Sequence, residues 1–216
     1  MKFFTNKLVI TAGLALLAVV IGFVFMTRPA SRNTPVAMAK EETVMDKDKK
    51  ILVVCYSFSR GNTKKIAKQL QEALDADYAE IEPVVPYPPY GGWHSEVVEQ
   101  GKREVASGYQ PEIKPLTVNV DDYDVIAIGT PTWWFTMAPP VLTFLNSHDW
   151  AGKTVIPFMT HGGWPGHVIE DIKRGCTGAE FAPAMEVQFD SEGGATMFTT
   201  QSEITEWIDG LKRAFR

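Results

Sequence analysis

The chain has 216 residues, of which 45% are hydrophobic, and its 21 basic and 26 acidic side chains give a formal net charge of −5 at pH 7. This length and hydrophobic content suit one well-buried domain with an additional segment. The acidic balance argues against a nucleic-acid partner, because a phosphate backbone attracts a basic protein face. The cysteines, Cys55 and Cys176, lack CxxC spacing, so we expect neither a metal site nor a dithiol motif.

The N-terminal segment contains an uncharged apolar stretch, Leu8–Met26, which follows two lysines. At about 1.5 Å per residue, a helix of this length approaches the roughly 30 Å hydrocarbon core of a bilayer. The sequence therefore predicts a membrane anchor or signal segment over residues 1–27, with the following domain on the extracytoplasmic side. Residues 28–49, with prolines and mixed charges, are predicted to form a flexible tether. The alternative is a protein secreted after cleavage near Ala39, where a small-residue pattern occurs.

Residues 50–216 are predicted to form one α/β domain, because apolar strand-like runs alternate with amphipathic helical stretches. Such alternation implies right-handed βαβ units and a single parallel sheet. Strands are expected over 51–56, 77–81, 123–129, 153–160 and 180–189. A first helix is expected to contain Ile66 and Leu70. Further helices are expected over 96–107, 139–146, 167–174 and 202–215.

The turn after the first predicted strand carries the signature of an anion site. A strand that leads into a helix through a tight turn leaves backbone N–H groups without partners, and the helix dipole favours a negative charge there. The pattern GxxxxGK[ST] is absent, as is GxGxxG, so a monophosphate is favoured over a nucleoside triphosphate or a dinucleotide. An ordinary helix capped by Asn62 or Thr63 is the alternative. The candidate phosphate-binding residues are Ser57, Ser59, Arg60, Gly61, Asn62 and Thr63.

Two further loops follow the third and fourth predicted strands. Parallel sheets bind ligands at the carboxyl ends of their strands, so all three loops are expected to meet at one edge. The aromatic side chains either form a wall for a flat ligand or fold back into the core, and the glycines let backbone groups lie against such a ligand. A planar heteroaromatic monophosphate such as FMN needs all three features. The candidate residues are Pro131, Thr132, Trp133, Trp134 and Phe135 in one loop and Thr160, His161, Gly162 and Gly163 in the other.

The stretches YSFSRGNTKKIA, GTPTWWFTMAPPVLTFL and DWAGKTVIPFMTHGG together resemble the flavodoxin-like family. This resemblance implies a three-layer sandwich, with a five-stranded parallel sheet in the order 2-1-3-4-5 and helices on both faces, and FMN as the cofactor. Phe58 stands where family members commonly carry a hydroxyl group. The phosphate-binding role therefore carries over most directly to Asn62 and Thr63.

The resemblance implies a redox protein that transfers electrons, or reduces a substrate through its flavin, at the membrane. Its partner would be a redox protein or a small quinone-like substrate. An NAD(P)H-dependent quinone or nitro reductase is the alternative, and so is a non-redox binding module that kept the fold.

Individual roles can also be assigned within the expected site. His161 is the one catalytic candidate, because it could place an N–H group near the flavin pyrimidine. We expect Trp133 to stack on the flavin and Trp134 to pack inward, since neighbouring side chains in an extended loop point in opposite directions. Tyr87, Tyr90 and Trp93 either cap the site or pack over the sheet edge.

Overall fold

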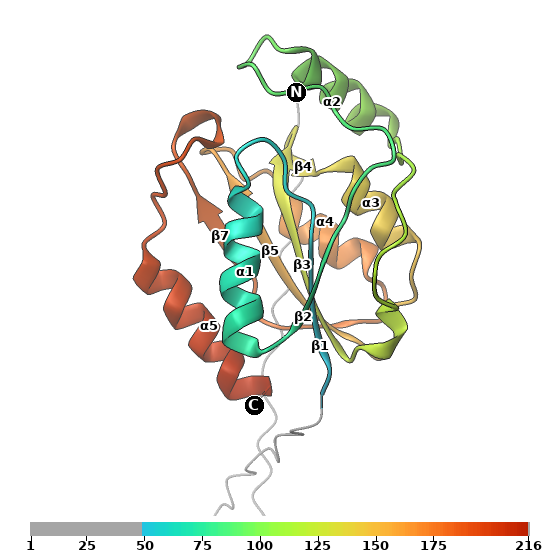
Figure 1. Cartoon of the computed structure of the whole chain (residues 1–216), viewed down its shortest axis with the longest axis vertical. Helices are drawn as coiled ribbons and strands as arrows, with labels where there is room; N and C mark the ends of the chain where they lie inside the picture. The colour runs from blue at the N-terminus through green and yellow to red at the C-terminus, as the bar shows by residue number, and fades with distance from the viewer. Residues whose placement is uncertain (1–48, 216) are drawn as a thin grey trace, which may run out of the picture. The chain divides into compact units, whose positions relative to one another are not determined.

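The structure is a computed structural model that describes residues 49–215 (Figure 1). The anchor predicted for residues 1–27 and nearly all of the tether predicted for 28–49 lie outside the described residues. Within 49–215, no helix is both long enough and apolar enough to cross a membrane.

One sheet forms the centre of the domain, and its strand order is β2-β1-β3-β5-β6. All neighbours along this path are parallel, whereas β4 is a short antiparallel partner of β3 and β7 is a second parallel partner of β5. The predicted order 2-1-3-4-5 is confirmed, with β6 and β7 together in the fifth position. The strands are β1 (Ile51–Cys55), β2 (Asp77–Glu80), β3 (Val125–Trp133), β4 (Thr136–Met137), β5 (Thr154–His161), β6 (Glu180–Phe181) and β7 (Met185–Gln188).

The last strand, predicted as one run over 180–189, is divided in the structure. β6 pairs with the start of β5 and β7 pairs with its end, so both halves follow the same neighbour. Pro183 lies between them and has no backbone N–H to donate to the ladder, which explains the break.

Helices cover both faces of the sheet (Figure 1). Alternate residues of each central strand point to opposite faces, so Val53 contributes to one hydrophobic cluster and Leu52 to the other. The first face is covered by α1 (Asn62–Leu74) and α5 (Gln201–Phe215). The second is covered by α3 (Pro139–Asn146) and α4 (Val168–Gly175).

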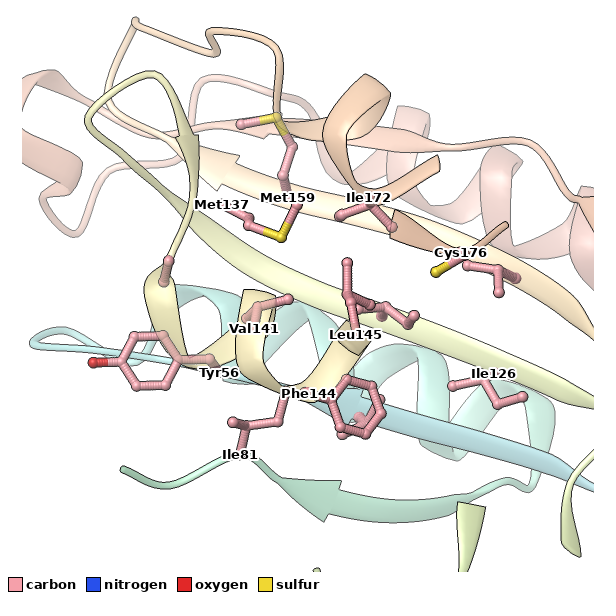
Figure 2. Close-up of a cluster of buried hydrophobic side chains, with 14 of the residues drawn as sticks. Tyr56, Ile81, Ile126, Met137, Val141, Phe144, Leu145, Met159, Ile172 and Cys176 are labelled. Carbon is pink, nitrogen blue, oxygen red and sulfur yellow. The ribbon is translucent and has the colours of Figure 1, made fainter. Parts of the chain in front are cut away.

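Figure 2 shows the cluster on the second face. Phe144 of α3 and Ile172 of α4 are fully buried there against Ile126 of β3 and Met159 of β5. Burying a side chain of this kind contributes about 1.5–3 kcal/mol, so this cluster fixes both helices against the sheet. The strand ends that bear the candidate site are therefore held on a rigid support.

The helix α2 (Glu96–Ser107) has the bounds predicted from the sequence but does not cover a sheet face. It lies beyond the carboxyl ends of the strands, near the top of the view in Figure 1 and close to β4. Val97 and Gly101 are its buried residues. The long connection between β2 and β3 thus brings a helix to the ligand-binding edge of the sheet.

Candidate functional site

A cavity of about 460 Å³ opens at the carboxyl ends of β1, β3 and β5. Three predicted loops meet there, together with the segment before α2 and the loop after β7. Every predicted site residue except Ser57, Gly61 and Gly163 lines this cavity. The lining residues are Phe58, Ser59, Arg60, Asn62, Thr63, Tyr90, Trp93, Val97, Val98, Pro131, Thr132, Trp133, Trp134, Phe135, Thr160, His161, Gly162, Trp164, Phe189 and Gly193.

The turn between β1 and α1 presents the start of a helix to the cavity. Gly61 is the N-cap and has a φ of 71°, a left-handed conformation that glycine adopts without strain. Ser57 does not line the cavity, and its Oγ accepts a hydrogen bond from the Lys64 N–H at 3.2 Å. The N–H groups of Asn62 and Thr63 precede any intrahelical acceptor and are the donors that a bound anion would use.

The side chain of Asn62 has a different role from the phosphate donor that the sequence suggested. Its Nδ2 donates to the carbonyl oxygens of Gly193 and Gly194, at 3.0 and 2.8 Å. Both amide hydrogens are thereby used to hold the loop after β7 against the start of α1. Asn62 therefore builds one wall of the cavity, and its backbone N–H is the group that would face a bound anion.

Thr63 forms a buried hydroxyl pair with Thr160, whose Oγ1 lies 2.8 Å from that of Thr63. A hydroxyl group carries one hydrogen and can also accept. Whichever threonine donates within the pair, the other retains its own hydrogen. Because both residues line the cavity, this second hydrogen is available to a ligand.

The segment after β3 is a tight hairpin rather than an extended loop. Trp133 pairs with Thr136, and the two residues between them, Trp134 and Phe135, have φ values of 48° and 68°. Positive φ at both central positions is the pattern of a type I′ turn, which usually contains Asn-Gly. Two aromatic residues in this conformation store on the order of 1–3 kcal/mol each, so the surroundings must hold the turn in place.

The burial of the two tryptophans is the reverse of what the sequence predicted. Trp133 is 9% exposed and contacts Phe58 and Tyr87, with ring centroids 5.4 and 4.9 Å away. Trp134 is 38% exposed, and the Lys102 Nζ lies 5.1 Å from its ring centroid. The expectation that Trp134 packs inward was wrong, because the turn replaces the extended geometry on which it rested.

The contact between α2 and the hairpin depends on a glycine. A Cβ atom at Gly101 would lie 1.8 Å from the Trp133 Nε1, so only glycine lets the helix approach this ring. Tyr87 joins the same aromatic cluster and donates to the Glu104 carboxylate at 2.6 Å. Of the three aromatics in the segment before α2, Tyr87 therefore packs over the strand ends, whereas Tyr90 and Trp93 line the cavity.

His161, the last residue of β5, has a defined hydrogen-bonding state. Its Nδ1 accepts from the Gly163 N–H at 3.1 Å, so the hydrogen of the neutral ring is on Nε2. Burial lowers the pKa of His161 below its ordinary value, against an opposing contribution from Glu186. The ring therefore enters the cavity as an uncharged hydrogen-bond donor.

Several lining residues were not predicted from the sequence. Val97 and Val98 belong to α2, and the sequence gives no signal that this helix lies over the site. Phe189 and Gly193 belong to the segment after β7, which is joined to the site through Asn62. Phe58 lines the cavity between two serines, in the position that departs from the family pattern.

The cysteines lie outside the cavity. Cys55 and Cys176 are both buried, and desolvation raises the pKa of each thiol to about 12. Neither thiol is therefore a reactive group at neutral pH. Among the described residues, no group of histidine, cysteine, aspartate and glutamate side chains is arranged to hold a metal ion.

A comparison with family models shows the family of this chain. Residues 50–210 match the model of the flavodoxin family. The chain belongs to the flavodoxin family. No curated protein sequence matches it.

Solved structures give the same assignment of the fold. A structure described as a flavoprotein of Bacteroides uniformis is 27% identical in sequence to this flavodoxin-family chain. The match covers 74% of this chain and 98% of that protein, with a TM-score of 0.62. A corresponding protein of Bacteroides eggerthii is 28% identical, covers 75% and 97%, and has a TM-score of 0.59. The flavoprotein of Lactobacillus acidophilus in complex with FMN is 22% identical, covers 74% and 98%, and has a TM-score of 0.52.

Proposed function

We propose that this chain binds FMN in the cavity at the carboxyl edge of the sheet and uses it for electron transfer. The observation that carries this proposal is the joining, in one cavity, of a helix N-terminus rich in neutral donors and an aromatic hairpin. FMN needs both, because it has a phosphate group at one end and a planar ring system at the other. The related flavoprotein of Lactobacillus acidophilus was solved in complex with FMN, which supports the choice of cofactor.

The phosphate would be held at the start of α1. The donors there are the backbone N–H groups of Asn62 and Thr63, the Thr63–Thr160 hydroxyl pair and Ser59, and Arg60 adds a positive charge. Hydrogen bonds to a charged group are stronger than those between neutral groups, so a dianion gains from each of these donors. The wall that Asn62 ties together excludes water from one side of this cradle.

The ring system would lie between the hairpin after β3 and the loop after β5. Trp133 and Trp134 supply aromatic surface there, and Gly162 lets the backbone approach. Bound FMN supplies the capacity to accept and release electrons. His161 would donate a hydrogen bond from Nε2 to the ring while itself remaining neutral.

The lining favours electron exchange with a protein or with an uncharged quinone-like molecule over reduction by NAD(P)H. Arg60 is the one permanently charged side chain among the described lining residues. A pyridine dinucleotide carries a pyrophosphate, which normally needs its own set of donors. The lining also contains apolar and aromatic residues that suit a flat apolar partner, namely Tyr90, Trp93, Val97 and Val98.

Purification of the full-length protein tests this proposal. We expect a yellow protein whose released cofactor is FMN, or an apoprotein that binds one equivalent of added FMN and quenches its fluorescence. We expect no oxidation of NADPH in the presence of a quinone, but reoxidation of the chemically reduced protein by that quinone. A colourless protein that does not bind FMN would overturn the proposal, and rapid NADPH oxidation would replace the electron carrier with a reductase.

A further inference from the structure

The hairpin between β3 and β4 needs an external support. Its central residues, Trp134 and Phe135, both hold a left-handed backbone conformation that aromatic residues rarely adopt. Both also line the cavity, so the shape of the turn sets the shape of the aromatic wall. The segment that leads into α4, together with Asp171 of that helix, supplies hydrogen bonds and packing contacts that hold the turn.

Asp171, near the start of α4, holds the side chain of Thr136, the residue that directly follows the hairpin turn. Its Oδ2 accepts a hydrogen bond from the Thr136 Oγ1 at 2.5 Å and another from the His167 Nδ1. Its Oδ1 accepts from the Arg174 Nη1 at 2.5 Å. Asp171 is only 9% exposed, so this carboxylate is a fixed acceptor with donors on both oxygens.

The backbone of the same segment contacts the turn itself. The His167 N–H donates to the Phe135 carbonyl oxygen at 2.9 Å. Gly166 lies directly beneath it, because a Cβ atom at position 166 would be 2.0 Å from that oxygen. The start of α4 and the hairpin therefore form one packed unit.

None of these supporting residues reaches the cavity. Asp171, Thr136, His167 and Gly166 are not among the residues that line it, whereas the turn that they support is. An effect of Asp171 on a ligand must therefore be indirect, and Thr136 is its hydrogen-bonded link to the hairpin.

We propose that Asp171 is a positioning residue, which holds Thr136 and thereby fixes the aromatic turn at the angle that the ring of a bound flavin requires. This inference rests on the proposed function. It means that Asp171, a buried carboxylate outside the cavity, helps to determine how tightly the aromatic wall binds the flavin ring. A simpler role, in which Asp171 only stabilises the start of α4, predicts lower thermal stability with unchanged ring binding.

The test compares Thr136→Val, which removes the hydroxyl group, with Thr136→Ser, which keeps it. Asp171→Asn is the second variant, and Glu170→Gln, an exposed acid on the same helix turn, is the matched control. Dissociation constants are measured for FMN and for riboflavin, which lacks the phosphate. The near-ultraviolet circular dichroism of each ligand-free protein reports the packing of the tryptophans.

We expect Thr136→Val and Asp171→Asn to weaken both ligands by about the same factor, on the order of tenfold, because the phosphate contacts are untouched. The near-ultraviolet signal should change in both variants and be restored in Thr136→Ser, while Glu170→Gln stays like the original protein. If Asp171→Asn fails to fold, the Thr136 pair decides alone.

Thr136→Val with original affinity for riboflavin would overturn the positioning role, even if its melting temperature fell. A loss confined to FMN would also overturn it, since it would place the effect at the phosphate. If the unsubstituted protein binds neither ligand, the proposed function fails first and this role fails with it. These outcomes are distinguishable because each is read from a different measurement.

Discussion

The buried hydroxyl pair gives the sharpest prediction about the phosphate end of the cavity. Thr63 is 1% exposed and Thr160 is 4% exposed, and their Oγ1 atoms are 2.8 Å apart. If Thr160 donates to Thr63, the Thr63 hydroxyl retains its hydrogen for the phosphate. Thr63→Val keeps the shape of the side chain and removes this donor.

Loss of a hydrogen bond to a charged group costs about 1.5–3 kcal/mol. Because each 1.4 kcal/mol corresponds to a tenfold change, Thr63→Val should weaken FMN binding by about 10- to 100-fold. Thr160→Val removes only the partner that orients Thr63 and should weaken FMN by a smaller factor. Flavin fluorescence quenching measures both constants, and riboflavin serves as the internal control because it has no phosphate.

Unchanged riboflavin affinity in Thr63→Val is needed for this interpretation. If Thr63→Val folds and binds FMN with the original dissociation constant, the phosphate is not held by this hydroxyl. Equal weakening of FMN and riboflavin would mean instead that the substitution distorts the whole cavity. A larger effect of Thr160→Val than of Thr63→Val would mean that Thr63 donates to Thr160 and that the Thr160 hydroxyl holds the phosphate.

Three further predictions concern the tryptophans, acid stability and placement in the cell. Trp133→Ala should lower the free energy of unfolding by about 3–5 kcal/mol in urea titrations, whereas Trp134→Ala should have a much smaller effect; the opposite order would contradict the observed burial. Burial alone would raise the pKa of Asp171, but hydrogen bonds from Thr136, His167 and Arg174 outweigh it and leave the pKa below its ordinary value of 3.8. The stability that Asp171 contributes is therefore complete above that value and lost as the pH falls through the folded-state pKa. In urea titrations at several pH values, Asp171→Asn should lose less unfolding free energy on acidification than the original protein. An equal loss in both proteins would contradict this contribution of the Asp171 carboxylate. Residues 1–27 predict that the full chain fractionates with membranes and that external protease reaches the domain; a soluble chain that begins at Lys40 would indicate cleavage after Ala39 instead.

The strands and the position of the site could be predicted from local patterns, whereas the strand order came from the resemblance to the flavodoxin-like family. Apolar runs identify the strands, and the prolines Pro139 and Pro140 mark the start of α3, where proline is tolerated. The carboxyl edge then follows from the topology of parallel sheets. The division of the last strand was also detectable, since Pro183 interrupts it in the sequence.

The details that could not be predicted depend on contacts between distant parts of the chain. Nothing local marks Trp134 and Phe135 as a tight turn, because Gly166 and Asp171 hold it from more than 30 residues away. The two carbonyl groups that accept from Asn62 lie more than 130 residues after it. Periodicity predicts α2, but it does not indicate that this helix lies over the site rather than against the sheet.

A crystal structure of the protein with FMN tests the central claim most directly. We predict density for the phosphate at the N–H groups of Asn62 and Thr63 and for the ring between the hairpin after β3 and His161. Density for FMN elsewhere on the molecule, or a phosphate far from the start of α1, would contradict the proposed site.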